Sequence, residues 1–203
     1  MNTLPTQVIR EITNQTIEIP ANTALTIVAI AKEGWDGQRT INFDFTGENS
    51  TLHFFAYTIG KNSDNFTLRT NSNHHKGHTN AYYTVRSVLN DKSQVDYTGQ
   101  LNIHPHAQVI DTHLGHHTLL LSRNAKVKTT PSLEIEADDV KAGHAASVGS
   151  LDEDLLFYLK SRGIDQATAR TLLIRGFLTT DLKHLDDHAL REKLEAELVS
   201  LSQ

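Results

Sequence analysis

Apolar and polar residues alternate along most of the chain, from Thr16 to about Val148. A period of two places apolar side chains on one face of a strand and polar side chains on the other, so the pattern predicts short β-strands. Turns rich in Asn, Asp, Gly and Ser separate these segments, and no helix-length periodic segment interrupts them. The alternation is clear at residues 17–19, 41–45, 67–70, 94–97 and 133–136. Periodicity alone is compatible with a sandwich, a barrel or a solenoid.

Helical signals begin after Val148 and Gly149. The segment Ser150-Leu151-Asp152-Glu153 predicts a capping box at the start of a first helix, and Gly163 predicts the end of that helix. Asp165 predicts the start of a second helix, and Asp186 or Asp187 predicts the start of a third.

Leucines recur along the third predicted helix at spacings of four, four and three residues. They are Leu190, Leu194, Leu198 and Leu201, and they form one apolar stripe on an otherwise charged helix. A bundle this small cannot bury all of its apolar surface, so we expect it to pack on the β part, on a partner, or on both. The sequence therefore divides into a β domain over residues 1–149 and a helical domain over residues 150–203.

Composition narrows the class of protein. The 203 residues include 38% hydrophobic and 21% charged residues, enough for one domain with a sizeable core. No apolar stretch approaches the roughly 20 residues that span a bilayer, and residues 1–5 carry no secretory signal, so the cytoplasm is the expected location. The net charge of −5 argues against nucleic-acid binding. The absence of cysteine excludes disulfides and thiolate ligands from this chain.

Histidine is the compositional exception, with 12 residues in the chain. Three groups have ligand-like spacing: His74-His75-x-x-His78, His104-x-His106 and His113-x-x-His116-His117. His104 and His106 would share a face if they lay on a strand, and His113, His116 and His117 are the first candidates for a metal site. No group completes a zinc signature, so the alternative is that these imidazoles decorate solvated strand faces and turns.

Other motifs point away from catalysis. Asp138 and Asp139 would point to opposite faces of a strand, so they do not suit the paired acids of a β-helical glycosidase and fit a turn better. The chain contains no phosphate-binding glycine loop, so any ATP would be bound by a partner. His144 lies in the small-residue stretch 142–146, where it is either packed against a backbone partner or exposed to another molecule.

Several segments together resemble the C-terminal core of the SufB/SufD family of the SUF iron–sulfur cluster assembly machinery. They are Leu119–Ser122, Lys128–Ile135, Ala137–Lys141, His144–Gly149 and Leu151–Ile164, and Ala169-Arg170 and Gly176-Phe177 continue the match. The specific part covers about residues 80–180, and residues 1–80 are compatible with it.

The resemblance implies a mainly β protein, a right-handed parallel β-helix followed by a small C-terminal helical domain. Family members are non-catalytic scaffold subunits whose β-helical cores pair and whose helices dock a SufC-type ABC ATPase. This chain would pair with a SufB-like subunit or with itself, and the sequence leaves that choice open. The docking candidates are the helix from Asp152 to Arg162, with Leu155 and Tyr158, and the stripe of Leu190, Leu194 and Leu198.

By the same resemblance, His144 matches the SufD-like histidine implicated at the subunit interface as an iron or cluster ligand. The family cysteine two positions earlier is Ala142 here, and the long N-terminal helical region typical of the family is not in this sequence. Without thiolates the chain is expected to bind no cofactor tightly by itself, and iron or a transient cluster would be shared with a partner. The alternative hypothesis is a histidine-based metal- or iron-binding protein on the same scaffold.

Overall fold

The computed structural model describes residues 6–9, 12–31, 37–185 and 187–202, in which strands precede helices. The strands are β1 (Thr6–Ile9), β2 (Gln15–Ile19), β3 (Ala24–Ala31), β4 (Gln38–Phe45), β5 (Ser50–Gly60), β6 (Asn65–His74), β7 (Thr79–Leu89), β8 (Gln94–Ile103), β9 (Ile110–Leu120), β10 (Lys126–Ile135) and β11 (Val140–Ser150). The helices are α1 (Glu153–Ser161), α2 (Gln166–Thr179), the 3-10 helix η1 (Thr180–His184) and α3 (His188–Ser202).

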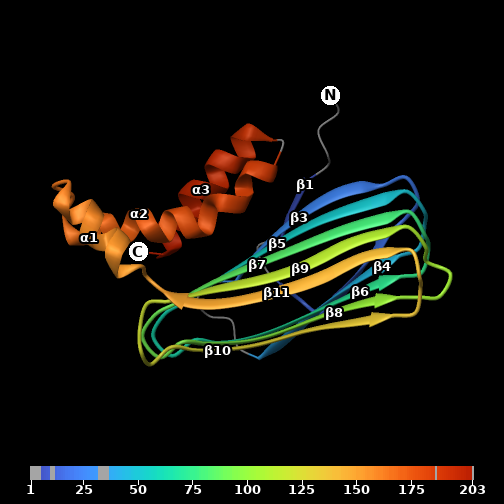
Figure 1. Cartoon of the computed structure of the whole chain (residues 1–203), viewed down its shortest axis with the longest axis horizontal. Helices are drawn as coiled ribbons and strands as arrows, with labels where there is room; N and C mark the ends of the chain where they lie inside the picture. The colour runs from blue at the N-terminus through green and yellow to red at the C-terminus, as the bar shows by residue number, and fades with distance from the viewer. Residues whose placement is uncertain (1–5, 10–11, 32–36, 186, 203) are drawn as a thin grey trace.

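The strands alternate between two parallel sheets. Odd-numbered strands form a six-stranded sheet in the order β1-β3-β5-β7-β9-β11, and even-numbered strands form a five-stranded sheet in the order β10-β8-β6-β4-β2. The chain thus winds as a β-solenoid of about five turns (Figure 1). Equivalent positions stack between turns: Asn71 donates a hydrogen bond to Asn42, 29 residues earlier. The parallel β-helix is confirmed, and the sandwich and barrel alternatives are wrong.

Alternate residues of each strand fill the space between the two sheets. Phe43 of β4 lies against Phe54 of β5 and Tyr83 of β7, with ring centroids 4.9 and 5.4 Å away. All three side chains are buried. Burying each ring contributes about 1.5–3 kcal/mol relative to leaving it in water. The period of two in the sequence is therefore an alternation between the solenoid interior and its outer faces.

The helices pack against the outer face of the six-stranded sheet near the carboxyl ends of its strands (Figure 1). This explains why the second part of β3, residues 27–31, is a continuous apolar run. Ile27 packs in the solenoid interior, whereas Val28 on the opposite face packs in the cluster that contains the helices. The leucines at the centre of that second cluster are Leu178, Leu182, Leu194 and Leu198, all fully buried. The small bundle thus buries its apolar stripe against the six-stranded sheet of the same chain.

The junction between the last strand and the first helix differs from the predicted capping box. Ser150 is the last residue of β11, held in register with Leu120 of β9, so it is not available as a helix cap. Asp152 caps α1 instead, and its Oδ1 accepts a hydrogen bond from the Leu155 backbone amide at 3.0 Å. Strand pairing extends one residue beyond the predicted boundary and displaces the helix start toward Glu153.

The remaining helix signals are confirmed where the structure describes them. Gly163 has a φ of +85°, as expected after the end of α1, and Asp165 caps α2 through the Thr168 amide at 3.0 Å. Asp187 Oδ1 accepts from the Leu190 amide at 3.0 Å, and Asp186 lies outside the described residues. No helix in the described part of the chain has the length and apolar character to cross a membrane.

Candidate functional site

The last turn of the solenoid, made by β10 and β11, leaves the core open at one end. Within the described chain, neither strand has a further neighbour on its outer edge. His144 of β11 is in register with Leu114 of β9, which is buried in the interior, so His144 faces the same way. Because no turn in the described part of the chain covers it, His144 is exposed. The structure therefore places this imidazole over the open end of the core.

The residues around His144 are mostly small or apolar. By register with the interior positions of β8 and β9, the residues that face the open end are Val127, Thr129, Pro131, Leu133, Ile135, Val140, Ala142, His144, Ala146 and Val148. We call these ten residues the open-end surface. Ile135 is 40% exposed and Val148 is 51% exposed. An apolar surface flanked by unpaired strand edges is a template for pairing with another chain.

The three histidines proposed as the first metal candidates are divided between the two faces of β9. His113 and His117 lie on the outer face, whereas His116 points into the interior and is fully buried. His116 Nε2 lies 3.0 Å from Ser87 Oγ, and burial lowers the pKa of His116 to about 4. The sequence spacing therefore does not create one site, because adjacent strand residues face opposite ways.

The other histidine pair is also separated. Strand β8 ends at Ile103, so His104 and His106 lie beyond it and do not share a strand face as predicted. His104 stacks on His75, with ring centroids 4.4 Å apart, and His106 is exposed in a turn. Among the described residues, no group of three His, Cys, Asp or Glu side chains is arranged to hold a metal ion.

A pocket of about 320 Å³ lies between the outer face of the six-stranded sheet and η1. His53, Tyr82 and His113 line it from the sheet, and Asp181 and His184 line it from η1. Sequence reasoning missed this pocket because its residues are separated by most of the chain. Only strand register and the folding back of the helices bring them together.

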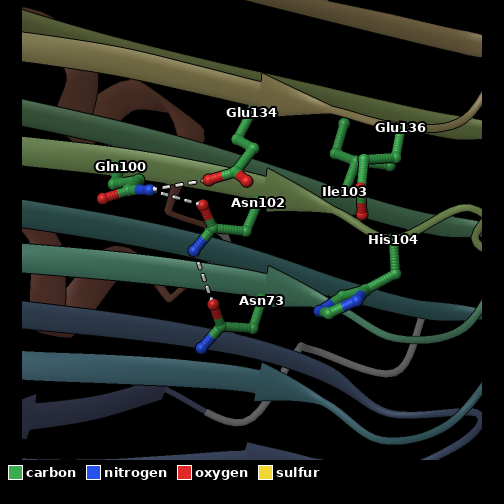
Figure 2. A pocket seen from close by; sticks show the side chains of 7 residues that line it. All are labelled: Asn73, Gln100, Asn102, Ile103, His104, Glu134 and Glu136. Carbon is green, nitrogen blue, oxygen red and sulfur yellow. Dashed lines mark hydrogen bonds between the residues drawn. The ribbon is translucent and has the colours of Figure 1, made fainter.

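A second pocket, of about 220 Å³, lies on the outer face of the five-stranded sheet (Figure 2). Gln100 Nε2 donates to Asn102 Oδ1 at 2.7 Å, and Asn102 Nδ2 donates to Asn73 Oδ1 at 2.7 Å. Asn73 in turn donates to Asp44 Oδ1 at 2.6 Å. These amides bond to one another along the solenoid, which gives them a structural role. Asp138 and Asp139 lie in the bend before β11, in agreement with the prediction that they fit a turn better than a pair of catalytic acids.

Comparison with known proteins identifies the family. A model described as SUF system FeS cluster assembly, SufBD core domain, matches residues 6–177. The chain belongs to the SufBD core family. The iron-sulfur cluster assembly protein SufD of Escherichia coli is 35% identical over 152 residues, which are 75% of this chain and 36% of that protein. SufD of Bacillus subtilis is 34% identical over 135 residues, which are 66% of this chain and 30% of that protein.

A SufBD family protein of Mycobacterium leprae is 40% identical over 103 residues, which are 50% of this chain and 26% of that protein. The SufBD core chain thus spans about a third of the length of the curated relatives it matches. The SufD-like resemblance predicted from the sequence is confirmed.

The helices of the SufBD core chain expose only some of the apolar residues that were expected to dock a partner. Leu194 and Leu198 are fully buried and Leu190 is partly buried, so the leucine stripe of α3 does not form a docking surface in this structure. That expectation is corrected: the stripe packs on the chain's own sheet. The exposed candidates are on α1, where Leu155 is 43% exposed and Tyr158 is 51% exposed. Phe157, which sequence reasoning passed over, is 73% exposed.

Proposed function

We propose that this SufBD core chain is a non-catalytic scaffold subunit in cytoplasmic iron–sulfur cluster assembly. It pairs through the open-end surface with a SufB-like subunit or with a second copy of itself, and it docks a SufC-type ABC ATPase through α1. Family membership supports the process, and the position of exposed His144 within the open-end surface is the observation that carries the pairing. Pairing there would cover exposed apolar side chains and two free strand edges at once.

The chemistry of His144 is limited to one imidazole, which binds iron but is not the soft ligand that iron–sulfur clusters prefer. The chain contains no cysteine, and Ala142 stands on the same face two residues before His144. In this proposal the partner supplies thiolates, and His144 contributes one ligand to iron or to a cluster that is passing through the interface.

Pairing is tested by replacing apolar residues of the open-end surface. We expect Ile135→Asp and Val148→Asp to abolish the complex with a co-expressed SufB-like subunit, and any homodimer, in analytical ultracentrifugation. Both side chains are exposed in the single chain, so the charges leave its folding intact. Ala196→Asp, which adds the same charge at an exposed position of α3, is the matched control. A complex that forms equally well with all three variants would contradict pairing through this surface.

Docking is tested on α1 in the same way. Phe157→Asp and Tyr158→Asp should abolish co-elution with a SufC-type ATPase, whereas Ala196→Asp should preserve it. Charges at Leu194 or Leu198 would disrupt the core between helices and sheet and would therefore report on folding. Unchanged co-elution of both α1 variants would remove the docking proposal while leaving the pairing proposal standing.

The arrangement of the side chains gives less support to the histidine-based metal-binding alternative. His116 faces the interior while His113 and His117 face outward, so these three imidazoles do not converge. Calorimetric titration with Fe²⁺ separates the two hypotheses. Stoichiometric binding by the isolated chain that is lost in His113→Ala and His117→Ala would favour the alternative, and binding that requires the partner and His144 would favour the scaffold.

A further inference from the structure

Three side chains form a row across the outer face of the six-stranded sheet. Arg86 of β7 is in register with His117 of β9, and His117 is in register with Ser147 of β11. In-register residues of parallel strands face the same side, so the three side chains are neighbours on one surface. The row runs from the part of the sheet under the helices to the edge strand that carries His144.

The helices contact the first residue of this row through an ion pair and a cation–π interaction. Arg86 Nε donates a hydrogen bond to Asp181 Oδ2 of η1, and the two side chains are only 11% and 18% exposed. The guanidinium also lies over the Phe177 ring at the end of α2, 4.8 Å from its centroid. A buried ion pair of this kind is costly to break from one side, because the remaining charge is left without a partner.

The edge strand β11 contributes the last residue of the row, Ser147, which pairs with His117. His117 Nδ1 lies 2.8 Å from Ser147 Oγ, which is within hydrogen-bonding distance. A Cβ atom on Gly115 would lie 3.2 Å from His117 Nε2, so the glycine leaves the space in which the imidazole ring lies over β9. Ser147 is flanked on β11 by Ala146 and Val148, which belong to the open-end surface.

We propose that His117 is a positioning residue that couples the seating of the helices on β7 to the conformation of the edge strand β11. When Asp181 holds Arg86, the guanidinium stays beside the helices and His117 is free to bond to Ser147. When Asp181 withdraws, Arg86 loses its counter-ion and must reorient next to His117, which disturbs the bond to the edge strand. The inference concerns this chain alone and goes beyond the proposed function, because it does not depend on which protein docks.

The charges around His117 agree with this arrangement. Burial lowers the pKa of His117, Arg86 lowers it further, Asp181 raises it and His113 lowers it. The imidazole therefore senses the charge balance of the Arg86–Asp181 pair, although the row itself is defined by register and hydrogen bonding.

Residue-resolved amide hydrogen exchange on the full chain tests the coupling. Asp181→Asn breaks the ion pair with little change in size. We expect it to accelerate exchange of the β11 amides near Ser147 by about fivefold, the equivalent of one hydrogen bond, and to leave the central strand β5 unchanged. In a His117→Leu background, Asp181→Asn should have no further effect on β11. In a His117→Asn background the effect should return, because the asparagine amide lies near the position of Nδ1.

Arg175→Gln is the matched control, because Arg175 pairs with Glu195 within the helices and does not contact the row. It should leave β11 exchange unchanged. Three results would each overturn the inference: no acceleration of β11 in Asp181→Asn, the same acceleration in the His117→Leu background, or equal acceleration in β5 and β11. The last result would show a general loss of stability in place of a directed coupling.

Discussion

Two histidines in the solenoid interior make the stability of this protein depend on pH. His74 Nε2 and Nδ1 lie 3.1 Å from Ser72 Oγ and 2.7 Å from Thr79 Oγ1, and the ring stacks on an interior phenylalanine. His116 is bonded to Ser87 and, like His74, is fully buried. Burial lowers the pKa of His74 to about 3 and that of His116 to about 4. Both imidazoles are therefore neutral in the folded protein throughout the physiological range.

The direction of the pH effect follows from proton linkage. In the unfolded chain both histidines titrate near their ordinary pKa of about 6.5. As the pH falls below this value, the unfolded state therefore binds more protons than the folded state. The stabilising contribution is fully present above pH 6.5 and is lost progressively below it, down to the folded pKa values. Between pH 7.5 and pH 5 each histidine removes about 2 kcal/mol, so the two together remove about 4 kcal/mol from the free energy of unfolding.

Urea denaturation followed by far-ultraviolet circular dichroism at pH 7.5, 6.5, 5.5 and 5 measures this loss. His74→Gln and His116→Gln should each remove about half of the dependence on pH, whatever they do to stability at pH 7.5. His106→Gln is the control for the substitution itself, because His106 is exposed in a turn outside the solenoid interior. If the wild-type protein and both interior variants have the same slope against pH, the reasoning from burial is refuted.

Two further predictions test the helical domain by chemical denaturation. Leu194→Ala should lower the free energy of unfolding by about 2–5 kcal/mol, because it leaves a cavity between helices and sheet. Phe157→Ala should change the free energy of unfolding by less than about 0.5 kcal/mol. Equal losses would contradict the assignment of Leu194 to the core and of Phe157 to the surface. Asp152→Ala should lower the free energy of unfolding by about 1 kcal/mol through loss of the helix cap, and Ser150→Ala should leave it almost unchanged. The reverse order would support the capping box predicted from the sequence.

Local signals in the sequence predicted local structure well. Gly163 and Asp165 mark helix ends through their own backbone and side-chain chemistry, and no distant residue changes that outcome. The capping box at Ser150 failed because a longer-range interaction, strand pairing with Leu120, competes for the same residue. Register of this kind cannot be read from a single segment.

The sheet topology and the candidate site needed more than periodicity. Alternation is the same in a sandwich and in a solenoid, so only the family resemblance selected the parallel β-helix. The leucine stripe of α3 was predicted correctly, but the sequence could not show that the outer face of β3 and its neighbours would cover it. The histidine spacing was clear at residues 113–117, yet the pleat of β9 sends His116 and His117 to opposite faces.

The repeat that aligns Asn42 with Asn71, 29 residues apart, has a consequence for how such chains can change in length. Gain or loss of one whole coil would keep every side chain on its present face of the solenoid. Insertion or deletion of a single residue inside a strand would instead move the following side chains of that strand to the opposite face. The helical cover limits this freedom, since it rests on β3, β5, β7 and β9 together. Related chains of different length are therefore expected to gain or lose entire coils outside the strands on which the helices pack.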